Sequence, residues 1–184
     1  MTTDELRGLA FSRMLQMADG EDSGEPLTDA ELEVLTPAER ELAFQMAARR
    51  LAFQLLYLRD ADKLADDASM REALTRVDGL GPLAAERIGE IVRGAFEGKD
   101  AADKEFVTLA PEWPTHRLAA VDRAILRLAH HELALKQTPG RVVVNEAVEL
   151  AKHYSTEKSP AFINGLLDRV LNREGRGGSD GGAA

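Results

Sequence analysis

The residues best suited to chemistry in this 184-residue chain are its histidines, its basic side chains and one glycine-containing turn. His130 and His131 are adjacent, so on a helix they point to different sides and cannot form the i, i+4 pair of a helical zinc site. His116 and His153 lie far from them in the sequence. No nucleophile–base pair or phosphate-binding glycine loop stands out. We therefore expect no metal, no cofactor and no catalytic residue.

The glycine-containing turn is GLGPLAAERI at residues 79–88. Its spacing resembles the loop of helix-hairpin-helix motifs, whose backbone amides hold a DNA phosphate at a helix N-terminus. Where such loops usually carry a lysine, this chain has Leu83 and Ala84. A Gly-x-Gly-Pro turn is also a compact connector between two helices, and we favour that interpretation.

A third candidate is a set of basic side chains with one aromatic ring: Arg49, Arg50, Lys152, Lys158 and Phe162. Exposed cations that contact phosphates, beside a ring on which a base can stack, are typical of single-stranded RNA binding. The alternative is that the charges are simply solvated and that the phenylalanine belongs to the core.

The charge distribution bears on that choice. The net charge of −9 argues against a general nucleic-acid coat protein. The charges are uneven, however: residues 1–112 carry 13 Lys and Arg against 24 Asp and Glu, and residues 113–176 carry 10 against 7. An acidic, solvated front half would explain this, but it also fits a basic surface built from the C-terminal half.

The elements that must position these residues are helices. Aromatic residues are few and no run alternates with period two, which predicts an all-α fold. Between Leu118 and Val170, three segments with apolar residues at spacings of three and four are separated by Gln137–Gly140 and by Ser155–Ser159. Further helices are expected at about 3–18, 36–59, 68–77, 84–96 and 103–109, and the first of the three C-terminal helices is expected to begin at Pro114.

Compartment follows from composition. The chain has no cysteine, which excludes disulfides and fits a reducing compartment. Its first 20 residues do not resemble a signal peptide, and no stretch approaches the roughly 18 apolar residues of a membrane span. We expect a cytoplasmic protein with no membrane association.

The C-terminal segments resemble the NusB family of bacterial transcription antitermination factors. The matching blocks are VDRAILRLA at 121–129, NEAVELAK at 145–152 and TEKSxxFINGLLD at 156–168. Upstream, residues 48–57 resemble the first helix of the family and match it at Ala52, Gln54, Leu56 and Tyr57. The arginine-rich run usual in that helix is reduced here to Arg49 and Arg50.

The resemblance implies an all-α, NusB-like fold of two small helical bundles, from about 36–98 and 99–174. A helical N-terminal extension at 1–35 would precede it, and a disordered tail at 175–184 would follow. Six residues are expected to be structural: Gln54, Tyr57, Asn145, Glu146, Asn164 and Gly165. Because glycine inside a helix costs about 1 kcal/mol, we expect Gly165 to admit a close backbone approach and Asn164 to cross-link buried backbone groups.

The resemblance also implies a function without catalysis. The chain would bind single-stranded boxA-like RNA together with the small-subunit ribosomal protein NusE, and would act on RNA polymerase indirectly during ribosomal RNA transcription. Arg49, Arg50, Lys152 and Lys158 would form one basic edge, with Phe162 stacking on a base. The alternatives are a protein-interaction module with lost or weak RNA binding, or a stand-alone relative of the RNA-binding domain of ribosomal RNA cytosine methyltransferases. Exposed apolar helix faces would also allow a homodimer.

Overall fold

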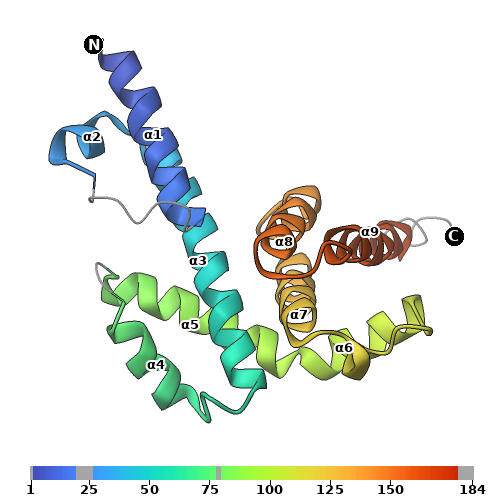
Figure 1. The fold of residues 1–184 in the computed structure, drawn as a ribbon. Helices are drawn as coiled ribbons and strands as arrows, with labels where there is room; N and C mark the ends of the chain where they lie inside the picture. Colours follow the sequence, from blue (N-terminus) through green and yellow to red (C-terminus); the bar gives the residue numbers. More distant parts are fainter. Residues whose placement is uncertain (1, 20–26, 78–79, 178–184) are drawn as a thin grey trace, which may run out of the picture. The chain divides into compact units, whose positions relative to one another are not determined.

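The computed structural model describes residues 2–19, 27–77 and 80–177, and in these ranges it contains helices and connecting loops but no strand. The all-α prediction is therefore confirmed. The helices are α1 Thr3–Asp19, α2 Asp29–Val34, α3 Pro37–Asp60, α4 Asp67–Thr75, α5 Pro82–Glu97, α6 Lys99–Leu109, a 3-10 turn at Thr115–Arg117, α7 Ala120–Leu135, α8 Gly140–Tyr154 and α9 Ser159–Gly177 (Figure 1).

Three helix boundaries differ from those expected. The helix predicted from Pro114 begins at Ala120, because the 3-10 turn ends in extended backbone at Leu118. α6 begins four residues before the expected Asp103, since the chain at Gly98 stays close to helical conformation and leads directly from α5 into α6. α9 continues to Gly177, so residues 175–177 of the predicted tail are helical; residues 178–184 lie outside the described ranges.

The chain forms two compact units, Met1–Leu51 and Ala52–Ala184, so α3 begins in the first and ends in the second. In the first unit α2 begins with a capping box in which Thr28 and Glu31 exchange hydrogen bonds. Hydrogen bonds from Thr28 and from the Arg13 guanidinium lower the pKa of Glu31 to about 2. Arg7 pairs with Glu39 at 3.4 Å. These contacts connect α1 to α2 and to the start of α3.

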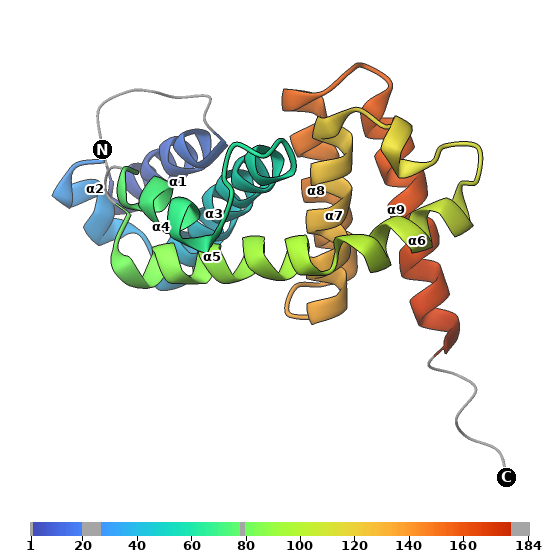
Figure 2. The ribbon, with the colours of Figure 1, turned by 90° about the horizontal axis from the view of Figure 1, so that it is seen from below.

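The second unit is built around α7, which packs against α5, α6, α8 and α9. Figure 2 shows α7 beside α8, with α5 and α6 following one another along nearly one line across them. Both faces of α7 are covered, so its side chains supply much of the core. The largest side chains buried here are Leu56, Met70, Leu74, Ile88, Phe106, Ile125, Leu126, Leu128, Ile163 and Leu167.

An ion-pair network crosses this unit. Arg127 of α7 is 7% exposed and donates hydrogen bonds to Asp60 of α3 and to both carboxylate oxygens of Asp103 of α6, at 2.6 to 2.9 Å. Arg123 adds two hydrogen bonds to Asp60, at 2.8 and 2.6 Å. Burial opposes ionisation of Asp60, but the hydrogen bonds from the two arginines hold its pKa below the usual value. The network thereby connects three helices at one end of α7.

Of the helices in the described ranges, none has both the length and the apolar character needed to cross a bilayer.

Candidate nucleic-acid interface

The turn between α8 and α9 is held at both ends by one buried carboxylate. Asp122, in the first turn of α7, is 7% exposed. One of its oxygens accepts a hydrogen bond from the Ser155 hydroxyl at 2.6 Å, and the other accepts one from the Ser159 hydroxyl at 2.9 Å. The Thr156 hydroxyl lies 2.8 Å from that of Ser159. This arrangement fixes where the turn leaves α8 and where α9 begins.

The fixed turn positions Lys158 and Phe162. The amide of Phe162 donates to the carbonyl of Lys158 at 3.3 Å, so Phe162 lies one helical turn after Lys158, the residue immediately before α9. Lys158 is exposed and Phe162 is half-buried. The phenylalanine is therefore not a fully buried core residue, and the structure brings these two predicted site residues together.

Trp113 is a second aromatic residue at this place, and the sequence reasoning missed it. Its ring centroid lies 5.9 Å from that of Phe162, with the ring planes tilted by 55°. It is 55% exposed, which is unusual for so large an apolar side chain. A sequence signal existed: this sole tryptophan lies in the segment PEWP between two prolines, which is typical of a surface loop.

The remaining predicted cations are placed differently. Lys152 is exposed on α8 and donates to Glu149 at 2.7 Å. Because this ion pair is exposed, Lys152 can leave Glu149 for another anion, such as a phosphate, at little cost in free energy. Arg50 is half-buried, and Arg49 is only 7% exposed. The expectation that Arg49 is exposed is therefore wrong: it falls on the side of α3 that carries the buried Ala48 and Ala52. Arg49 and Arg50 belong to the first unit, and the other three residues to the second.

Two expectations about α9 are also wrong. Gly165 is exposed, and a Cβ built on it would meet no atom within 4 Å, so no helix approaches it closely. Asn164 is exposed and donates to Asp168 at 3.3 Å instead of joining buried backbone groups. The cause is the rotation of α9: its buried side chains are Ile163, Leu166, Leu167 and Val170, which leaves positions 164 and 165 on the outer side.

The other motif residues lie mostly on the surface. Gln54, Tyr57 and Asn145 are exposed, and Glu146 is half-buried. Packing in the core therefore does not explain the match of Gln54 and Tyr57 to the family pattern. Both lie on the last turns of α3, in the second unit.

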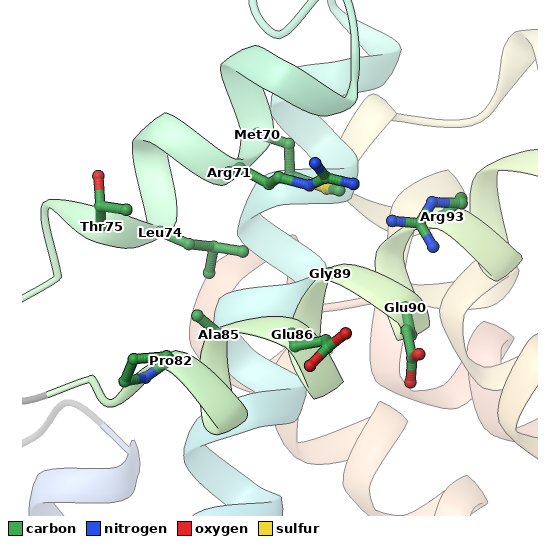
Figure 3. A pocket seen from close by; sticks show the side chains of 10 residues that line it. All are labelled: Met70, Arg71, Leu74, Thr75, Pro82, Ala85, Glu86, Gly89, Glu90 and Arg93. Atoms are coloured by element: carbon green, nitrogen blue, oxygen red, sulfur yellow. The ribbon is translucent and has the colours of Figure 1, made fainter.

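The turn before α5 lies beside a groove of about 480 Å³ between α4 and α5 (Figure 3). The groove has an apolar floor with Met70 and Leu74, and carboxylates as well as guanidinium groups line it, among them Glu86 and Glu90. Gly81 caps α5 with φ −69°, a conformation open to any residue, and Gly79 lies outside the described ranges. The first turn of α5 carries neither acidic nor basic side chains, with Leu83 and Ala84 after Pro82. It therefore offers a phosphate no cation, which favours the connector interpretation.

The two adjacent histidines have separate surroundings. His130 Nε2 lies 3.0 Å from Glu105, and its ring meets Phe106 edge to face. The ring of His131 packs directly on Gly94, where a Cβ would collide with it, and burial lowers the pKa of His131. Within the described ranges, no three histidine or carboxylate side chains gather as a metal site would require.

Comparison with known proteins gives matches to one family. A model of the NusB family matches residues 46–172. The transcription antitermination protein NusB of Streptomyces griseus is 41% identical over 133 residues, which are 70% of this chain and 92% of that protein. The protein of the same name from Symbiobacterium thermophilum is 39% identical over 142 residues, 72% of this chain and 93% of that protein.

Solved structures of NusB proteins also match this chain. T. maritima NusB superposes with a TM-score of 0.62 at 33% identity, covering 68% of this chain and 88% of that one. A chain from the crystal structure of antitermination factors NusB and NusE in complex with dsRNA superposes with a TM-score of 0.63 at 27% identity. That match covers 71% of this chain and 97% of that one.

Proposed function

Because the chain belongs to the NusB family of transcription antitermination factors, we propose that it binds single-stranded boxA-type RNA together with the ribosomal protein NusE. The complex would associate with RNA polymerase in the cytoplasm during ribosomal RNA transcription. The observation that carries the proposal is the Asp122-held turn, which presents Lys158 one helical turn before Phe162, whose ring meets Trp113.

The net charge of the chain limits where RNA can bind. A chain with a net charge of −9 repels RNA except where cations gather locally. Lys158 and Lys152 are exposed cations near the two ends of the α8–α9 turn. The half-buried Phe162 lies one helical turn after Lys158, and its ring meets the exposed ring of Trp113. Cations that contact phosphates beside rings that stack on bases are the recurring design of single-strand binding. We propose Arg50 as a further phosphate contact.

The comparisons support both partners. A similar chain occurs in a structure whose name includes NusB, NusE and double-stranded RNA. The family consists of antitermination factors rather than enzymes, so the RNA is bound and not altered. The relatives reported above are antitermination proteins, which favours this function over kinship with a methyltransferase domain.

Charge-reversal variants test the proposal. Each phosphate contact to single-stranded RNA contributes about 0.7 to the slope of log K against log salt. Lys158→Glu should therefore weaken binding of a boxA-type RNA and reduce the magnitude of that slope by about 0.7. Lys104→Glu, the same charge change at an exposed position on α6, is the matched control and should leave the slope unchanged.

Phe162→Ala separates stacking from charge. It should weaken binding by about 1–3 kcal/mol, the contribution of one stacked base, without changing the salt slope. Circular dichroism must show that the variant is folded. If Lys158→Glu and Phe162→Ala both bind RNA as the parent does, the proposed interface is wrong. A protein-interaction module would then be the better account.

A further inference from the structure

Beside Phe162 the surface is hollowed into a pocket of about 220 Å³, lined by Trp113, Phe162, Gly165 and Arg169 among others. Nothing in the packing of α9 requires a glycine at 165, because a Cβ there would meet no atom within 4 Å. Glycine also destabilises the interior of a helix relative to alanine. Because position 165 has no side chain, this part of the pocket lining is open.

The walls of the pocket are aromatic and well anchored. The amide of Trp113 donates to the carbonyl of Ala110 at 2.9 Å, and prolines at 111 and 114 flank the turn. The tilt of 55° between the rings of Trp113 and Phe162 prevents them from stacking on each other. With 55% of its surface exposed, Trp113 keeps apolar ring surface available to a ligand.

Cations flank these walls. The guanidinium of Arg169 donates to the carbonyl of Leu109 at 2.7 Å, which holds it at the pocket. Lys158 lies one helical turn before Phe162. Glu112 is the acidic residue of the lining and is exposed to solvent. A ligand with a planar aromatic group and negative charges on both sides of it would contact both the aromatic walls and the flanking cations. An apolar protein side chain would contact only the walls.

We propose that this pocket holds one unpaired base of the bound RNA, stacked on Trp113 and admitted by Gly165, with the adjacent phosphates facing Lys158 and Arg169. The inference rests on the proposed function and adds to it a base-binding subsite. A paired base stays stacked within its duplex and cannot enter, so the pocket selects single-stranded RNA.

The chain has only one tryptophan, so intrinsic fluorescence reports directly on Trp113. A labelled single-stranded boxA-type RNA is titrated with the full chain, and the anisotropy of the RNA label and the emission of the tryptophan are followed together. We expect quenching over the same concentration range as the rise in anisotropy. Anisotropy without quenching would overturn the pocket while leaving the proposed function standing; no anisotropy change would refute the proposed function itself.

Two variants at one position sharpen the test. Gly165→Leu places a side chain in the pocket and should weaken RNA binding by about tenfold or more, the effect of losing one stacked base. Its melting temperature should not fall, because a Cβ at position 165 meets no atom within 4 Å and the pocket of about 220 Å³ has room for the rest of the side chain. Gly165→Ala, the control, should bind within about twofold of the parent. Parent-like binding by Gly165→Leu would overturn the proposal.

Two further titrations of the parent distinguish other occupants. Duplex RNA should leave the tryptophan emission unchanged, and quenching by duplex equal to that by the single strand would contradict an unpaired base. NusE without RNA should also leave it unchanged. If NusE alters the emission and RNA does not, the pocket receives a protein side chain and the assignment to RNA is wrong.

Discussion

Removing the carboxylate of Asp122 should loosen the turn that carries Lys158. In the folded protein the two Asp122 oxygens accept hydrogen bonds from Ser155 and Ser159, at 2.6 and 2.9 Å. A hydrogen bond to a charged group contributes about 1.5–3 kcal/mol to stability. Losing both hydrogen bonds should therefore cost at most about 3–6 kcal/mol. The two hydroxyls keep each other as partners at 3.0 Å. We therefore expect Asp122→Ala to lower the free energy of unfolding by about 3 kcal/mol.

Urea denaturation followed by circular dichroism measures this difference. Asp122→Asn keeps the shape and one acceptor oxygen, so it should lose about half as much, roughly 1.5 kcal/mol. Glu149→Ala is the control: it removes a carboxylate from an exposed pair with Lys152 and should change stability by less than about 0.5 kcal/mol.

The same variants connect stability to function. RNA affinity should fall in Asp122→Ala, even at temperatures where the variant remains folded, because Lys158 and Phe162 depend on the turn. Asp122→Asn should recover part of it. A loss of unfolding free energy below about 0.5 kcal/mol in Asp122→Ala would refute the view that this carboxylate fixes the turn.

Three further predictions concern the scaffold. Arg127→Ala leaves two partly buried carboxylates without their shared guanidinium, so the free energy of unfolding measured in urea should fall by about 3–5 kcal/mol. The control Arg76→Ala removes one partner of an exposed ion pair and should lower it by less than about 0.5 kcal/mol. Burial lowers the pKa of His131, so the free energy of unfolding should reach its full value above pH 6.5, the ordinary pKa of histidine, and fall as the pH drops below it. His131→Gln should flatten this pH dependence between about pH 7.5 and 5. An unchanged slope in that variant would exclude His131 as its source. Deleting residues 1–26 should shift the main melting transition by less than about 5 °C, because the ion pairs of α1 are made within the first unit.

Local sequence rules were enough to locate the helices of the C-terminal region. The Pro-Gly pair at 139–140 and the polar run at 155–159 end and begin helices where expected, because both act through backbone conformation alone. The start of α7 was not predictable in the same way. A proline at 114 fits the first turn of a helix, yet only tertiary packing decides that the chain passes through a 3-10 turn first.

The candidate site shows what a sequence pattern leaves open. Lys158 and Phe162 could be paired because they lie four residues apart, about one helical turn, at the start of α9. Trp113 could not be added to them, since its partner lies 49 positions away along the chain. The close helix approach predicted at Gly165 is wrong because the sequence does not show which side of α9 faces the core, and the rotation of α9 leaves position 165 outside.

The most direct test of the proposed function is one binding titration of the unmodified chain. Labelled single-stranded boxA-type RNA is titrated by fluorescence anisotropy at fixed salt, with and without NusE, and with a scrambled RNA alongside. We predict binding that is tighter for the boxA-type sequence and tighter again when NusE is present. Equal, salt-sensitive binding of both RNAs only near 10⁻⁴ M, roughly the range of non-specific contacts, with no effect of NusE, would contradict it.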